Sequence, residues 1–191
     1  MITATVQHPQ IGVCGLSCRL CPRYQTEAKS KCNGCKTASR MGAGCAFVTC
    51  ALKRKGVEFC WQCDESAGCE KWRKHRDLGK QYDSFVCYQA LEDNIAFVRE
   101  HGIAAFEQTQ LSRESLLKRM LAGFNDGRAK TKFCIAATLL PIDDLAAALQ
   151  QAENSSAGLE IKAKSKLLHS LLDKLAEGRG VVLKLRSGRK L

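Results

Sequence analysis

The sequence predicts an α+β protein, mainly α, in which a metal-stapled, cysteine-rich N-terminal segment packs on a helical C-terminal region. Three observations lead to this fold class. Ten of the twelve cysteines in the 191-residue chain fall between Cys14 and Cys69, at spacings typical of zinc-ribbon or zinc-knuckle ligands. Beyond Cys69, apolar residues recur every three or four positions, as in amphipathic helices. Near the C-terminus, residues 181–183 form a short apolar run that favours a strand.

The first predicted domain covers residues 10–78, and we expect metal ions to hold it together. It lacks the aliphatic periodicity of a hydrophobic core, and segments of this kind usually need a staple. Its C-x2-C pairs allow two sulfurs to face one ion from a single tight turn. The candidate metal ligands are Cys14, Cys18, Cys21, Cys32, Cys35, Cys45, Cys50, Cys60, Cys63 and Cys69. The glycines beside them, which suit turns with positive φ, are Gly15, Gly34, Gly44 and Gly68.

Disulfide bonds are the alternative use of so many cysteines, but they require an oxidising compartment. The opening residues 1–9 show neither the basic nor the apolar region of a signal peptide. No apolar run approaches the roughly 18 residues of a membrane span. We therefore expect a cytoplasmic protein without a membrane segment, whose thiols bind metal.

The spacing is compatible with two four-thiolate zinc sites. The first would use Cys18, Cys21, Cys32 and Cys35. The second would use Cys50, Cys60, Cys63 and Cys69. Cys14 and Cys45 then remain as spares, or belong to a different partition of the ten thiols. We expect about two zinc ions, and loss of structure in residues 10–78 when they are chelated.

An iron–sulfur cluster is the alternative cofactor, because cysteine spacing does not separate it cleanly from zinc. Cys14-x3-Cys18-x2-Cys21 is the spacing with which radical S-adenosylmethionine enzymes hold a [4Fe–4S] cluster. Those enzymes need a repeated strand–helix barrel after the motif, whereas this chain continues mainly with helical patterns. A cluster used for electron transfer or sensing therefore remains the second hypothesis.

The rest of the chain is expected to form a helical domain over residues 79–150, a linker over 151–158 and a basic helix and tail over 159–191. Residues 72–80 precede this region as a charged connector. Within it, the periodicity predicts one helix that stops at Gly102 and another that Ser112 caps. A buried helix should end at Pro141, and Asp143 should cap the next one.

The net charge of +11 is unevenly distributed, and this bears on the partner class. Residues 1–80 carry 14 Lys and Arg against 6 Asp and Glu, but thiolates bound to metal would offset part of that excess. Residues 159–191 carry 9 Lys and Arg against 3 Asp and Glu, and they contain no cysteine whose thiolate could offset this excess. The partner is not identified by these patterns, although basic surfaces suit a protein or nucleic-acid partner. An interaction or binding module is therefore the expected kind of protein.

No catalytic motif is recognisable, and we name no catalytic residue. The four histidines are scattered, and none belongs to an H-E-x-x-H pattern. There is no phosphate-binding loop, and Asp126 lies in a turn that its side chain is suited to form. The sequence gives no support for an enzyme.

The cysteine motifs resemble those of a known family. Residues 14–22 resemble its opening C-G-L-x-C-x-x-C-P signature, and residues 32–35 its central C-x-G-C. Residues 60–71 resemble its closing C-x-x-C-x-x-x-P-C-E-K element, although Gly68 replaces the proline and the gap before Cys69 is one residue longer. The family is the group of cysteine-rich prokaryotic proteins catalogued as domain of unknown function 3795. The resemblance implies a cytoplasmic bacterial or archaeal protein with a metal site, and it implies no reaction.

Overall fold

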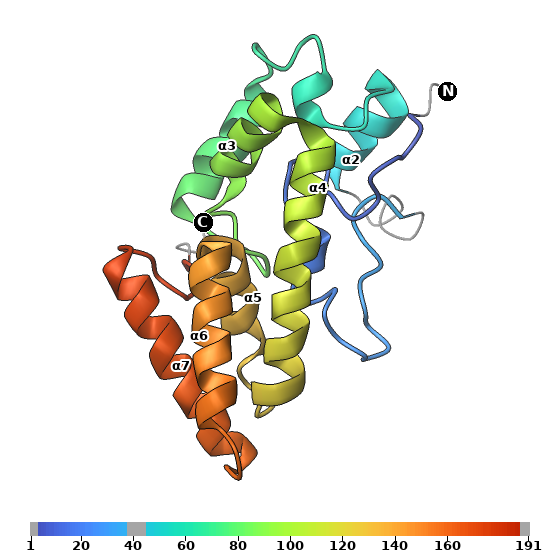
Figure 1. Cartoon of the computed structure of the whole chain (residues 1–191). Helices are drawn as coiled ribbons and strands as arrows, with labels where there is room; N and C mark the ends of the chain where they lie inside the picture. Colours follow the sequence, from blue (N-terminus) through green and yellow to red (C-terminus); the bar gives the residue numbers. More distant parts are fainter. Residues whose placement is uncertain (1–3, 38–44, 188–191) are drawn as a thin grey trace. The chain divides into compact units, whose positions relative to one another are not determined.

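The structure is a computed structural model that describes residues 4–37 and 45–187 (Figure 1). The chain divides into two compact units. Unit 1 contains the residues up to 108 together with those from 186 onward, and unit 2 contains residues 109–185. All ten clustered cysteines lie in unit 1.

The expected α+β fold is wrong, because the described residues form an all-helical protein without a β-sheet. The β-type pairing found in the described ranges is one isolated bridge between Ile11 and Ser17. The run at 181–183 forms no strand. Its first backbone N–H, that of Val181, donates to the carbonyl oxygen of Ala176 and so closes the preceding helix, with Gly180 at φ 63°. The described parts of the cysteine-rich segment, residues 10–37 and 45–78, likewise consist of turns, loops and helices in place of a zinc ribbon.

Unit 1 contains several short helices before its two longer ones (Figure 1). A 3-10 turn, η1, spans Cys18–Leu20, and α2, Ala46–Val48, continues directly into the π-helical segment η2, Thr49–Lys55. A second 3-10 turn, η3, spans Cys60–Gln62. Next come α3, Glu70–Gln81, and the first part of α4, Leu91–Phe124.

Small apolar clusters hold these short elements in place of a single large core. Ile11 and Phe59 pack with two residues of α4, Val98 and Phe106. A second cluster joins Val13 to α2 and η2, and a third joins Leu16 to α3 and α4. Because each cluster includes a residue between positions 11 and 16, the first cysteine loop is buried from several sides.

The segment expected to be a charged connector, residues 72–80, lies inside helix α3. Trp72 and Gly79 are the buried residues of α3, and most of its other side chains are charged or polar. The helix therefore has a low apolar content. The charged side chains of α3 find partners on a neighbouring helix: Arg76 forms an ion pair with Glu92 of α4. A nearly polar helix of this type carries little periodic signal.

Helix α4 is broken at Gly102, where the backbone adopts φ 83° and ψ 164°. The expected helix end at Gly102 therefore appears as a sharp kink, since a non-glycine residue rarely takes this conformation. Ser112, expected to cap a separate helix, lies within α4.

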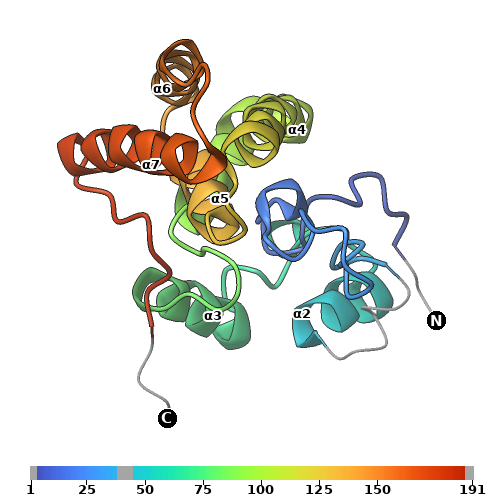
Figure 2. The same ribbon diagram turned by 90° about the horizontal axis from the view of Figure 1, so that it is seen from below.

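Unit 2 consists of the end of α4 and three further helices: α5, Lys130–Leu139, α6, Ile142–Ser155, and α7, Ile161–Gly178. Helices α6 and α7 lie side by side in both views (Figures 1 and 2). Their facing sides bury Leu145, Leu149, Leu168 and Leu172 almost completely. The segment assigned to a linker, 151–158, contains the end of α6 and the connection to α7. None of the helices in the described residues combines the length and apolarity that crossing a bilayer requires.

We expect Leu172→Ala to destabilise unit 2 by about 2–5 kcal/mol, because it removes a fully buried side chain and leaves a cavity. Leu159→Ala is the matched control, since Leu159 is 41% exposed and its truncation should cost no more than about 0.5 kcal/mol. Amide hydrogen exchange in α5–α7 measures both effects. Equal loss of protection in the two variants would contradict the packing described for α7.

Candidate metal centre

A tight loop presents the first two cysteines. The N–H of Gly12 donates to the carbonyl of Leu16 at 2.8 Å, and the N–H of Cys18 to that of Gln10 at 2.7 Å. Gly15 turns the chain between them with φ 93°, and a Cβ at this position would lie 3.1 Å from the Trp61 ring. The glycine is therefore required both by the backbone conformation and by the close indole.

The second C-x2-C pair is brought against the first by another glycine. Gly34, between Cys32 and Cys35, has φ 109°, and a Cβ there would lie 3.1 Å from the carbonyl oxygen of Pro9. The same Cβ position is 3.9 Å from Sγ of Cys18. The positive φ expected beside the ligands is thus present at Gly15 and Gly34. It is not found at Gly68, and Gly44 lies outside the described residues.

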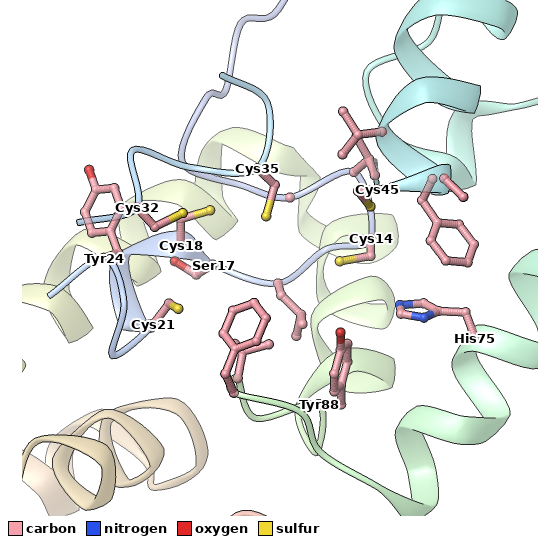
Figure 3. A pocket seen from close by; sticks show the side chains of 18 residues that line it. Cys14, Ser17, Cys18, Cys21, Tyr24, Cys32, Cys35, Cys45, His75 and Tyr88 are labelled. Carbon is pink, nitrogen blue, oxygen red and sulfur yellow. The ribbon is translucent and has the colours of Figure 1, made fainter. Parts of the chain in front are cut away.

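The two pairs line one cavity of about 480 Å³ (Figure 3). The cysteines at its surface come from the opening loop, η1, the second pair and the residue before α2: they are Cys14, Cys18, Cys21, Cys32, Cys35 and Cys45. In Figure 3 the side chains of Cys14 and Cys35 extend toward the same space from two separate loop segments. The remaining wall is mainly apolar and aromatic.

The thiols around the cavity influence one another electrostatically. A side-chain hydrogen bond with Cys35 lowers the pKa of Cys18, against the opposing effect of burial. Burial raises the pKa of Cys21, and the nearby Cys32 and Cys35 raise it further. Burial also raises the pKa of Cys14 to about 12. Without a compensating positive charge, the Cys14 thiol would therefore stay protonated at neutral pH.

A second group of cysteines surrounds η3. Burial raises the pKa of Cys60 to about 12, and thiolate charge on Cys14, Cys50 and Cys69 adds to this effect. Cys63 and Cys50 both act on the ammonium of Lys55. Charge on Cys50 and Cys69 thus acts on Cys60, while the second expected zinc site itself stays a prediction.

Metal ligation itself stays a prediction. In a tetrahedral zinc site the sulfurs lie about 2.3 Å from the ion, hence about 4 Å from one another. Among the described residues, no group of three or more His, Cys, Asp or Glu side chains is arranged so that it could hold a metal ion. No disulfide joins any of the twelve cysteines, all of which lie within the described ranges. The described arrangement is a set of neighbouring thiols around a cavity.

Lys36 and Glu58 form a buried ion pair in unit 1 that the sequence did not single out. Lys36 Nζ is 2.7 Å from Glu58 Oε1, with the lysine side chain fully buried and the glutamate 8% exposed. Nζ also donates to the carbonyl of His8 and lies 3.9 Å above the Phe59 ring. Burial lowers the pKa of Lys36, while Glu58 and the thiolates of Cys18 and Cys14 oppose that shift. Lys36 thus provides a positive charge close to the thiols.

His75 and Ser17 also line the cavity, although neither belongs to a motif that singles it out in the sequence. His75 extends from α3 into the space beside Cys14 in Figure 3, and its ring contacts those of Phe47 and Tyr88. Burial lowers the pKa of His75. Its Nε2 atom and the Oγ atom of Ser17 are buried without a hydrogen-bond partner in the described structure.

The wall formed by residues 85–88 is fixed by a buried carboxylate. Asp83 accepts hydrogen bonds from the backbone N–H of Tyr88 at 2.6 Å and from the backbone N–H of Arg186 at 2.8 Å. The Arg186 guanidinium donates to the same carboxylate and to the carbonyls of Gly79 and Lys80. Burial alone would raise the pKa of Asp83, but Arg186 and the backbone donors hold it below its usual value. Arg186, assigned to the basic tail, is thus part of the fold of unit 1.

Residues 10–74 match the family model described as protein of unknown function (DUF3795). The match includes all ten clustered cysteines and confirms the family resemblance that the cysteine motifs carry. No curated protein and no solved structure gives a significant match to the chain. The family assignment therefore rests on the cysteine-rich segment and brings no activity with it.

We expect Lys36→Met to destabilise unit 1 by about 3–5 kcal/mol, because it leaves the Glu58 carboxylate buried without its cation. Lys31→Met is the matched control: Lys31 also forms an ion pair, with Glu27, but both side chains are largely exposed, so the loss should stay below about 1 kcal/mol. Urea unfolding followed by the fluorescence of Trp61 and Trp72 compares the two. Similar midpoints would show that the buried pair adds no stability.

Proposed function

We propose that this protein is a thiolate metal-binding protein that holds about two zinc ions in unit 1. The observation that carries the proposal is the convergence of six cysteines on one cavity, from four separate segments of the chain. Thiols that merely fill a core have no reason to gather in this way, because cysteine packs as a small apolar residue wherever space allows. The first zinc ion would use Cys18, Cys21, Cys32 and Cys35.

The raised pKa values of thiols in unit 1 support metal binding, because these thiols need a nearby cation before they can ionise. Burial holds the pKa of Cys14 and Cys60 at about 12, so both require a strong positive charge to ionise. A divalent ion supplies that charge and displaces the thiol protons as it binds. Lys36 offsets part of the negative charge that remains.

The second zinc ion would be held by Cys50, Cys60, Cys63 and Cys69. Support comes from Cys50 and Cys69, whose charge raises the pKa of Cys60 in addition to the effect of burial. The N–H of Cys60 donates to the carbonyl of Val13 at 2.8 Å, so this group is tied directly to the loop that carries Cys14. Such a link would couple the two centres through the backbone. A reducing compartment such as the cytoplasm would keep all these thiols available.

An iron–sulfur cluster is the second candidate for the cavity, and the size of the cavity favours it. A single ion bound by four sulfurs leaves almost no free volume, whereas this cavity measures about 480 Å³. Thiolates are the ligands of both kinds of centre. A cluster would supply one-electron transfer, and the surrounding residues would exclude water from it.

Colour and elemental analysis of anaerobically purified protein separate the two candidates. Zinc gives a colourless protein with about two zinc ions per chain and no acid-labile sulfide. An iron–sulfur cluster gives a brown protein that contains iron and sulfide in similar amounts. Less than one metal ion of either kind per chain would refute the proposed function.

We expect Cys35→Ala to reduce the metal content by about one ion or cluster per chain, because a four-thiolate site loses a ligand. Hydrogen-exchange protection in residues 10–37 should fall with it, since metal binding and folding are coupled. Cys87→Ala is the control: Cys87 is a cysteine of unit 1 outside the clustered ten, and it is buried whereas Cys35 is exposed, so a loss of packing alone would affect Cys87→Ala more.

Both variants are compared with the unaltered chain after the same anaerobic purification. Full metal content in Cys35→Ala would exclude Cys35 as a ligand. Equal metal loss in both variants would attribute the effect to general destabilisation of unit 1.

A further inference from the structure

The end of the chain returns to the cysteine-rich unit. Unit 2 ends at Leu185, and the chain rejoins unit 1 at Arg186. The backbones of Arg186 and Asp83 are bonded in both directions. The N–H of Asp83 donates to the carbonyl of Arg186 at 2.9 Å, and the N–H of Arg186 donates to the Asp83 carboxylate at 2.8 Å. These bonds attach the C-terminal segment to the connection between α3 and α4.

The Arg186 side chain adds a second set of bonds at the same place. Its Nε and Nη2 atoms donate to the two Asp83 carboxylate oxygens at 3.0 and 3.1 Å. The guanidinium also donates to the carbonyls of Gly79 and Lys80, in the last turn of α3, where helix carbonyls lack partners within the helix. Since the Asp83 side chain is completely buried, loss of the guanidinium would leave a buried charge unpaired.

The segment held by these bonds forms one wall of the cavity. Residues 82–90, all of them described, run from α3 to α4 as bends and turns without helix or strand. The cavity-lining residues among them are Phe85, Val86 and Tyr88. Asp83 also accepts the N–H of Tyr88 at 2.6 Å, so its carboxylate holds both ends of this stretch. A segment without regular structure depends on such contacts for its position, and Arg186 therefore acts on the wall through Asp83.

This wall meets the cysteine loops where the cavity borders solvent. Phe85 lines the cavity and is nevertheless 46% exposed. The guanidinium of Arg23 lies over its ring, 4.3 Å from the centroid, and the Arg23 carbonyl accepts the N–H of Cys32 at 2.9 Å. Within the cavity, the Cys18 and Cys21 side chains are buried. Movement of the wall away from Arg23 would therefore open a path to buried thiols.

We propose that the C-terminal segment is a strap that keeps the cavity closed over its thiols, with Arg186 as a positioning residue that acts through Asp83. The strap limits how fast molecules from solution reach Cys18 and Cys21. The part of the proposal that concerns metal exchange rests on the proposed function, because exchange requires access to these thiols. The strap lies outside residues 10–74, which the family model matches, so it is a feature of this chain beyond the family segment.

Alkylation of the full chain by iodoacetamide, followed at each cysteine by peptide mass spectrometry, tests the strap. Arg186→Ala should raise the alkylation rates of Cys18 and Cys21 at least about tenfold, because an unpaired buried carboxylate favours opening of the wall. The rates of Cys50 and Cys63, which belong to unit 1 but do not line the cavity, should stay unchanged. Unchanged rates at Cys18 and Cys21 would overturn the proposal. An equal rise at all four cysteines would also overturn it, since general unfolding of unit 1 would then explain the result.

Chemical rescue separates positioning by the guanidinium from a loss of packing. Guanidinium added to Arg186→Ala, at a concentration too low to unfold the chain, should restore slow alkylation, because the free cation can pair with the Asp83 carboxylate. Urea at the same concentration carries no charge and should not. Arg179→Ala is the matched control: Arg179 also pairs with an aspartate, Asp144, but is 54% exposed, so this variant should behave like the unaltered chain. Rescue by neither compound, or equally by both, would overturn the role of Arg186.

Metal analysis of each sample keeps the strap and the metal function apart. In a metal-loaded chain, Arg186→Ala should also transfer its metal to a chelator at least about tenfold faster, since the same opening admits the chelator. Selective alkylation of Cys18 and Cys21 in a variant of a chain that contains no metal would support the strap while refuting the metal function. A metal-loaded variant that is alkylated and releases metal like the unaltered chain would refute the strap alone.

Discussion

The buried ion pair between Lys36 and Glu58 connects the parts of unit 1 that a hydrophobic core of this size could not hold. Glu58 accepts the backbone N–H groups of Gln7 and His8, and Lys36 donates to the carbonyl of His8. Three segments far apart in the sequence thus meet at two side chains. Since Lys36 directly follows Cys35, the same contact fixes the second cysteine pair.

The position of this lysine also bears on the charge of the proposed centre. Two four-thiolate zinc sites would each carry a net charge of −2, and burying such charge is unfavourable unless cations lie close by. Lys36 provides one cation beneath the first group of thiols, and Lys55 lies beside the second. The basic excess of the N-terminal region is therefore used in part within unit 1. Less of it remains for an external acidic partner than the net charge suggests.

The cysteine spacing was enough to identify the family, which the match over residues 10–74 confirms, because short C-x2-C motifs are local and depend on few other residues. It could not predict the fold class. The apolar run at 181–183 reads as a strand, but the N–H of Val181 is used to cap α7. Helix α3 was missed because its exposed face is almost entirely charged and Trp72 is its main apolar anchor. The roles of Lys36, His75 and Ser17 depend on contacts between distant segments, for which a single sequence carries no periodic signal.

The contact between Asp83 and Arg186 has a consequence for the synthesis of this chain. The two residues are 103 positions apart, and the Asp83 side chain is completely buried in the folded protein. While the chain is still emerging from the ribosome, Asp83 and the wall at Tyr88 have no guanidinium to neutralise them. Unit 2 is made in the meantime, since its residues lie between the two partners. Unit 1 is therefore translated first but completed last, and a stop codon anywhere in unit 2 would leave the buried Asp83 carboxylate without its cation.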